Sequence, residues 1–125
     1  MEVIKKIGGS YKLPVVALGM FDGVHLGHAG VICRAVEVAR QIGGTAIVFT
    51  FSNHPLSVLS PENAPLMIGS RSLRRDIFES LGVEILIEVP FTKELSRKSP
   101  EEFLELLREK ISPAYVVTGP NYTFG

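Results

Sequence analysis

Two histidines in a glycine-rich turn, His25 and His28, are the residues of this sequence best suited to chemistry. Histidines three residues apart share one face of a helical turn, and the free N–H groups at a helix start attract anions. Such imidazoles can contact phosphate oxygens while charge spreads in a transition state. Two other interpretations stay open: the histidines cap the helix, or they bind a metal. A zinc site would need a further cysteine or histidine, and the sequence brings none close to this pair.

Alternating strands and helices must position this turn. Apolar or β-branched runs predict strands at 15–18, 45–51, 83–89 and 115–118. Apolar residues recurring three and four positions apart predict helices at 28–42, 70–81 and 99–110. This order indicates an α/β fold with an open parallel sheet and helices on both faces. In such sheets ligands bind beyond the carboxyl ends of the strands, which is where the histidine turn follows Gly19.

The segment 99–102, Ser-Pro-Glu-Glu, is the clearest local signal for a helix start. Serine can accept hydrogen bonds from the first-turn amides, proline fits the first helical position, and a glutamate at the third position completes a capping box. In the helix that follows we expect four inward-facing side chains: Phe103, Leu104, Leu107 and Ile111.

Three other features carry less information. Arg71, Arg74 and Arg75 form a basic cluster, which we expect to be a solvated helix face with at most a minor role near phosphates. Residues 52–69 contain three prolines and no clear period, so they form either a functional loop or an element that the pattern conceals. Cys33 lies off the apolar stripe of its helix and has no activating partner, so we assign it no function.

The length and composition of the chain exclude several classes of protein. The 125 residues, with a mass of 13.7 kDa, allow at most one domain. Thirteen basic and thirteen acidic side chains cancel, whereas a nucleic-acid binder normally carries a basic excess. No apolar run approaches the ~18 residues that cross a bilayer, the start lacks a secretory signal, and a single cysteine excludes an internal disulfide. We therefore expect a cytoplasmic protein that binds neither nucleic acid nor membrane.

Three ordered segments resemble one known family. The turn Gly19-Met-Phe-Asp-Gly-Val-His-Leu-Gly-His28 is similar to the His-x-Gly-His signature of nucleotidyltransferases. In its longer form it resembles the FMN adenylyltransferase (FAD synthetase) domain of the bacterial bifunctional riboflavin kinase/FAD synthetase family. Thr50-Phe-Ser-Asn-His-Pro55 and Val117-Thr-Gly-Pro-Asn-Tyr-Thr-Phe-Gly125 resemble two further motifs of that family. Members often carry an acidic residue and a proline where this chain has Ser52 and Asn53.

The resemblance implies a Rossmann-like sheet of the nucleotidyltransferase type that lacks the family's C-terminal part. Residues 1–125 would be the N-terminal portion of an FMN adenylyltransferase domain, without a riboflavin kinase domain. The implied reaction transfers AMP from ATP to FMN, forms FAD and releases pyrophosphate. Mg²⁺ is expected to neutralise the phosphates.

The resemblance also implies roles for individual residues. His25 and His28 would be catalytic, while Gly23 and Gly27 would let the nucleotide approach the backbone. The expected ATP site consists of Gly19, Phe21, Asp22, Gly23, His25, Gly27, His28 and Asn121. The expected flavin site consists of His54, Pro55, Asn121 and Phe124.

Alternatives remain for several of these assignments. Asp22 either caps the turn, which we favour, or holds a water of Mg²⁺; Phe124 could be a core aromatic, and His54 could brace its own loop. The chain could also be a related nucleotidyltransferase with another phosphate acceptor, such as a cytidylyltransferase or a pantetheine-phosphate adenylyltransferase. A non-catalytic fragment that binds nucleotide or flavin is the third possibility. The sequence makes no prediction about the oligomeric state.

Overall fold

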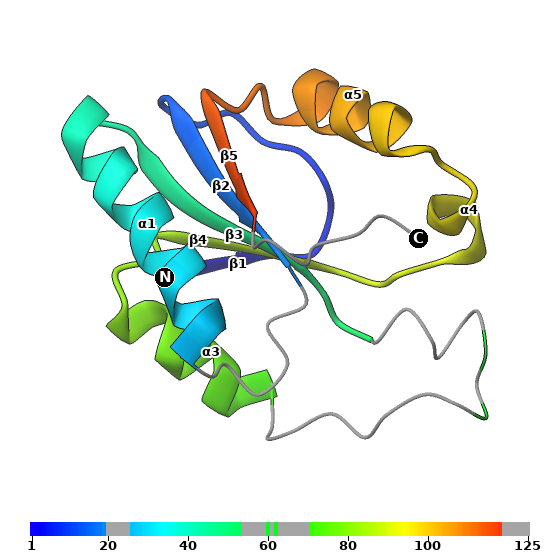
Figure 1. The fold of residues 1–125 in the computed structure, drawn as a ribbon, viewed down its shortest axis with the longest axis horizontal. Coiled ribbons are helices and arrows are strands. Elements are labelled where there is room, and N and C mark those ends of the chain that lie inside the picture. The colour runs from blue at the N-terminus through cyan, green and yellow to red at the C-terminus, as the bar shows by residue number, and fades with distance from the viewer. Residues whose placement is uncertain (20–25, 54–59, 61, 63–70, 119–125) are drawn as a thin grey trace.

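A five-stranded parallel sheet forms the centre of the molecule (Figure 1). The computed structural model describes residues 1–19, 26–53, 60, 62 and 71–118. The strands are β1 (Glu2–Ile4), β2 (Pro14–Leu18), β3 (Thr45–Phe51), β4 (Ile85–Val89) and β5 (Tyr115–Thr118). Their spatial order is β1-β4-β3-β2-β5. Because every pairing is parallel, the carboxyl ends of all five strands lie at one edge of the sheet.

Helices cover both faces of the sheet, as Figure 1 shows. They are α1 (Leu26–Ile42), α3 (Arg71–Ser80), α4 (Lys93–Ser96) and α5 (Pro100–Lys110). The first two pack on one face, and α4 and α5 lie over the other. The predicted α/β fold, with an open parallel sheet between helices, is confirmed.

The strands alternate strictly between two apolar cores, because successive side chains of a strand point to opposite faces. Beneath α1 and α3 lie Val15, Ala17, Ala46, Val48 and Leu86, packed against Ile32, Ala35, Val36, Ala39 and Phe78. Beneath α5 lie Val16, Leu18, Ile47, Phe49, Phe51, Ile85, Ile87 and Val89, packed against Phe103, Leu107 and Ile111. Burial of these two surfaces supplies the main driving force for folding.

The predicted helix boundaries agree with the structure to within two residues, but two short elements were not predicted. Strand β1 has three residues, too few to show a period, and exists because it pairs with β4. Helix α4 is a single turn, capped by the Thr92 hydroxyl, which accepts a hydrogen bond from the Leu95 amide at 3.2 Å. Strand β4 begins at Ile85 rather than at 83, because the Val83 amide still donates to the Phe78 carbonyl at the end of α3.

The start of α5 confirms the predicted capping box. The Glu102 amide donates to the Ser99 hydroxyl at 3.1 Å, and the Ser99 amide donates to the Glu102 carboxylate at the same distance. Two first-turn amide donors are thereby satisfied, and Pro100 occupies the first helical position.

The expected inward face of α5 was wrong at one position. Phe103, Leu107 and Ile111 are buried, but Leu104 is 44% exposed. The three buried residues follow one another at spacings of four, so they define one stripe along the helix, and Leu104 lies about 100° around the helix from Phe103. The sequence alone does not show how far a helix is rotated against its sheet.

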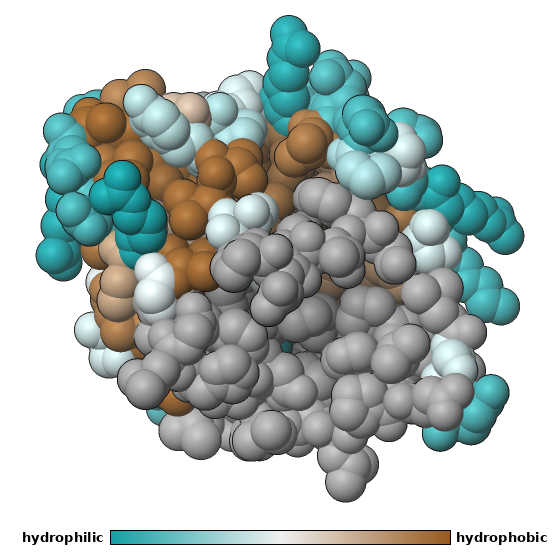
Figure 2. Space-filling model, viewed as in Figure 1, coloured by the Kyte–Doolittle hydropathy of each residue, from teal (hydrophilic) through white to brown (hydrophobic). Residues whose placement is uncertain are grey.

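Apolar surface also remains on β5, which has a single neighbour, β2, in the described sheet. Tyr115 and Val116 are 54% and 38% exposed. Figure 2 shows the molecule in the same view as Figure 1. Apolar residues gather in the upper part of this view, where Figure 1 places β2 and β5. Among the described helices, none is long and apolar enough to cross a membrane.

Candidate functional site

The histidine turn connects the carboxyl end of β2 to the N-terminus of α1. The β2 residues Val15 to Leu18 are at most 1% exposed, which fixes the strand in the middle of the sheet. The Gly19 amide donates to the Phe49 carbonyl at 3.3 Å, so the chain leaves the sheet only after this residue. Gly27 and His28 lie in the first turn of α1. This strand–turn–helix arrangement is the context that the phosphate-binding interpretation requires.

Helix α1 directs the positive end of its dipole at the same edge of the sheet. Its apolar stripe, which includes Ile32, Ala35 and Ala39, is buried against β2 and β3, and this packing sets the direction of the helix. Its first turn contains no acidic side chain that would neutralise the free amides. The amides at the start of α1 therefore favour an anion at the carboxyl edge.

Three strand ends bring the three motif segments together. Strand β2 lies between β3 and β5, with Leu18 in register with both Phe49 and Thr118. Adjacent strands are about 5 Å apart. The segments that follow β2, β3 and β5 in the sequence therefore start side by side at the carboxyl edge, although they are far apart in the chain.

Of the predicted site residues, the structure brings Gly19, Gly27 and His28 to one corner of the fold. The others lie outside the described residues: Phe21, Asp22, Gly23, His25, His54, Pro55, Asn121 and Phe124.

The chain beyond β3 is fixed by hydrogen bonds that the sequence did not reveal. The Ser52 amide donates to the Val89 carbonyl at 2.8 Å. The Asn53 side chain accepts from the Phe91 amide at 2.7 Å and donates to the Phe91 carbonyl at 3.2 Å. The first residues after β3 are thus held against the end of β4, directly before the segment that begins with His54.

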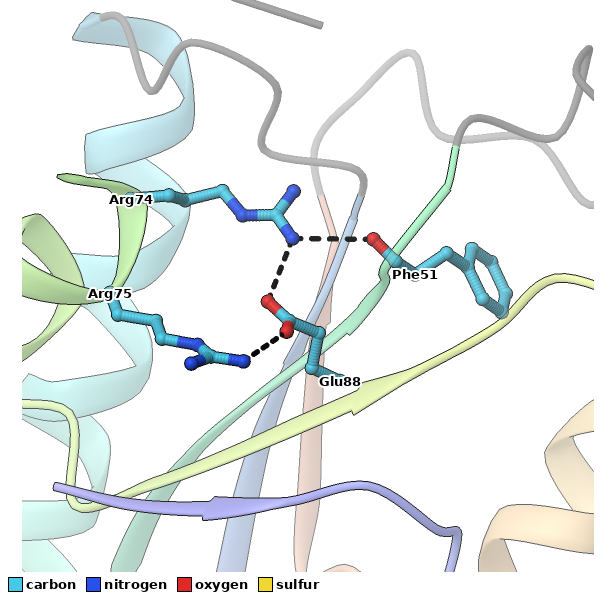
Figure 3. A network of polar contacts seen from close by, with 4 residues as sticks. All are labelled: Phe51, Arg74, Arg75 and Glu88. Carbon is cyan, nitrogen blue, oxygen red and sulfur yellow. Dashed lines mark hydrogen bonds and ion pairs between the residues drawn. The ribbon is translucent and has the colours of Figure 1, made fainter. Parts of the chain in front are cut away.

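A buried charge network supports the carboxyl edge from the α3 side (Figure 3). The Arg74 guanidinium lies 2.9 Å from one carboxylate oxygen of Glu88 and 3.3 Å from the Phe51 carbonyl. The Arg75 guanidinium lies 2.7 Å from the other Glu88 oxygen. The network therefore joins α3 to the ends of β3 and β4.

The expected solvated basic face was wrong for two of its three arginines. Arg74 is only 6% exposed, the Arg75 side chain is 31% exposed, and both bind Glu88. A signal was present in the sequence: Glu88 interrupts the apolar run of β4, and a buried carboxylate requires a cationic partner. Arg74 and Arg75, in the preceding helix, were the available cations. The Arg71 side chain lies outside the described part of the structure.

Glu88 is held in its charged form. Burial raises the pKa of this carboxyl group, but hydrogen bonds from Arg75 and Arg74, together with their charges, outweigh burial and leave its pKa below the usual value. At neutral pH the network therefore consists of one carboxylate and two guanidinium ions.

Comparison with known proteins gives a consistent result. A model of the FAD synthetase family matches residues 10–125. The bifunctional riboflavin kinase/FMN adenylyltransferase of Bacillus subtilis is 37% identical over 112 residues, covering 89% of this chain and 35% of that protein. Its Listeria monocytogenes counterpart is 40% identical, covering 89% of this chain and 36% of that protein. An FAD synthetase from the same Listeria species is 30% identical, covering 89% of this chain and 45% of that protein.

A solved structure shows the same architecture. The crystal structure of a macrolide-efflux protein from Streptococcus pneumoniae matches with a TM-score of 0.85 and 29% identity, covering 98% of this chain and 49% of that chain. The chain therefore spans between about a third and a half of the length of these relatives.

Proposed function

We propose that this chain, which belongs to the FAD synthetase family, is the N-terminal portion of an FMN adenylyltransferase domain. The reaction joins the phosphate of FMN to the AMP part of ATP. An FMN phosphate oxygen attacks the α-phosphorus in line, the bond to the β-phosphate oxygen breaks, and pyrophosphate leaves on the opposite side. The products are FAD and pyrophosphate.

One observation carries this proposal: in a chain of this family, Gly19 directly follows a buried strand and His28 lies in the first turn of the next helix. Phosphoryl-type transfer depends on positioning the reactants and neutralising the developing charge, and it needs no protein nucleophile. The helix amides at this corner, together with the imidazoles that we assign to it, would supply both requirements.

Within this proposal the histidine turn binds ATP. His25 and His28 contact the triphosphate around the reacting centre and stabilise the charge that spreads over its oxygens. Gly23 and Gly27 allow the nucleotide to approach the backbone, since a glycine has no Cβ. To Asp22 we assign the capping of the turn.

The flavin is assigned to the segments that flank this turn. Strands β3 and β5 lie on either side of β2, and they lead in the sequence to His54 and Pro55 and to Asn121 and Phe124. We assign the two aromatic or apolar residues of this set, Pro55 and Phe124, to the flavin ring. Asn121 supplies a polar contact that ATP and flavin can share.

Magnesium enters this proposal as part of the substrate. Among the described residues, no group of three or more histidine, cysteine, aspartate or glutamate side chains could hold a metal ion. Mg²⁺ is bound largely by the phosphates of a nucleotide and by water, so we propose that it enters the site together with ATP. We also place the reaction in the cytoplasm, in line with the single cysteine of the chain.

The test uses the complete protein with ATP, Mg²⁺ and FMN, and follows FAD and pyrophosphate by chromatography. His28→Ala is expected to lower turnover ~10²–10³-fold without unfolding the protein, as expected for the loss of one charge-stabilising donor. Cys33→Ser, an exposed position on the same helix, is the matched control and should keep wild-type turnover.

Other substrates separate the related reactions. FMN is replaced in turn by pantetheine phosphate, and ATP by CTP. A preference for either replacement would contradict the assigned substrates, and near-normal FAD formation by His28→Ala would remove the catalytic role of the histidine. Binding of ATP and FMN without any turnover would identify a non-catalytic protein.

A further inference from the structure

We infer that Arg74 is a positioning residue for FMN, acting through the carboxyl end of β3. The inference rests on the proposed function for the identity of the substrate. Its structural basis is the pair of contacts that Arg74 makes, with Glu88 at 2.9 Å and with the Phe51 carbonyl at 3.3 Å (Figure 3).

The peptide group between Phe51 and Ser52 is bound on both of its polar atoms. Its carbonyl oxygen accepts from Arg74 of α3, and its N–H donates to the Val89 carbonyl of β4. A peptide group is planar and rigid, so two hydrogen bonds to different elements fix its orientation. The direction in which the chain leaves the sheet is therefore set partly by α3.

The next residue, Asn53, is also held in place by hydrogen bonds. Its side chain bonds both the amide and the carbonyl of Phe91, so it ties the chain after β3 to the segment after β4. Phe51 is thus bonded to α3, Ser52 to β4, and Asn53 to the segment that follows β4. The next two residues in the sequence, His54 and Pro55, begin one of the segments to which we assign the flavin.

Arg75 offers an internal comparison. Arg74 and Arg75 bind the two oxygens of the same carboxylate, at 2.9 and 2.7 Å, but Phe51 accepts its hydrogen bond from Arg74. A purely structural role in neutralising Glu88 would be shared by both arginines. The hydrogen bond that orients the peptide group at the end of β3 comes from Arg74.

The experiment compares Arg74→Lys with Arg75→Lys in the complete protein. Each variant keeps a positive charge beside Glu88 and replaces a planar guanidinium by a single ammonium group, which cannot reproduce its fixed pair of donors. The KM values for FMN and for ATP are measured separately, and FMN binding without ATP is followed by quenching of flavin fluorescence. Circular dichroism confirms that each variant is folded.

We expect Arg74→Lys to raise the KM for FMN on the order of 10-fold, because a small displacement of a binding segment has large kinetic effects. The KM for ATP should stay within about 2-fold, and Arg75→Lys should leave both values within the same limit. Weaker FMN binding in the fluorescence titration should accompany the change in KM.

Two results would overturn the inference alone: an unchanged KM for FMN in Arg74→Lys, or equal effects of the two variants on both substrates. A wild-type protein that makes no FAD from ATP and FMN would instead overturn the proposed function, and the inference with it. If Arg74→Lys does not fold, Arg74→Gln is compared with Arg75→Gln in the same titration of FMN fluorescence.

Discussion

Asn53 and Phe91 are joined by a reciprocal pair of hydrogen bonds between a side chain and a backbone. The Phe91 amide donates to the Asn53 side-chain oxygen at 2.7 Å, and the Asn53 side-chain nitrogen donates to the Phe91 carbonyl at 3.2 Å. The carboxamide thus binds both backbone polar groups of Phe91, just beyond the point where β3 and β4 end. A proline side chain at this position would offer neither group.

Removing the carboxamide tests how much this pair contributes to stability. Asn53→Ala should lower the free energy of unfolding by about 1–3 kcal/mol, because it leaves two half-buried backbone groups of Phe91 without their partner. Urea unfolding followed by circular dichroism measures the change. Gln41→Ala removes a carboxamide from an exposed pair with Glu37 and should change the free energy of unfolding by less than about 0.5 kcal/mol. If the two variants lost equal free energy of unfolding, the pair of Asn53 and Phe91 would not stabilise the fold more than an exposed pair does.

Glu88 should make stability depend on pH at the acidic end. Because its pKa is lowered in the folded protein, ionised Glu88 stabilises the fold above the unfolded-state value of about 4.3, and this contribution is lost as the pH falls through the lowered folded-state value. Glu88→Gln cannot ionise. It should cost about 3–5 kcal/mol at neutral pH, since the buried Arg74 guanidinium and the partly buried Arg75 guanidinium both lose the negative charge of Glu88.

The measurement is the difference in unfolding free energy between wild type and Glu88→Gln, obtained from urea titrations at several pH values. We expect this difference to be constant from about pH 7 to about pH 5 and to shrink below about pH 4. Glu105→Gln, in an exposed pair with Arg108, should show little difference at any pH. A Glu88→Gln difference that persists to about pH 2 would contradict the lowered pKa.

The capping box at the start of α5 should be measurable by itself. Ser99→Ala is expected to lower the free energy of unfolding by about 1 kcal/mol, because the Glu102 amide loses its acceptor. Ser80→Ala, which removes an exposed hydroxyl near the end of α3, is the control and should change it by less than about 0.5 kcal/mol. If Ser99→Ala and Ser80→Ala change the free energy of unfolding by the same amount, the capping box does not stabilise the helix.

Two leucines of α5 test how the helix is rotated against the sheet. Leu107 is fully buried, so Leu107→Ala should cost about 2–5 kcal/mol through lost burial and the cavity left behind. Leu104 is 44% exposed, and Leu104→Ala should cost less than about 1 kcal/mol. Thermal or urea unfolding measures the stability of both variants. If Leu104→Ala lost more free energy of unfolding than Leu107→Ala, the face of α5 that carries Leu104 would be the one packed on the sheet.

Local patterns in the sequence were sufficient for much of the fold. The spacing of Ile32, Ala35 and Ala39 predicted the buried stripe of α1, and the capping box at Ser99 predicted the start of α5. The order of strands and helices predicted the parallel sheet, because neighbouring parallel strands need a crossover between them. The same order predicted that the histidine turn connects a strand to a helix. Each of these features depends on residues that are close together in the chain.

Contacts between distant segments were decided only by the tertiary structure. A buried carboxylate such as Glu88 needs a cationic partner, but only the packing of α3 beside β4 determined that Arg74 and Arg75 provide it. The pair of Asn53 and Phe91, 38 residues apart, exists because β3 and β4 are neighbours in the sheet. The exposure of Leu104 follows from the rotation of α5. The physical reason is common to all three: a local period shows which side of an element is apolar, whereas packing decides what that side meets.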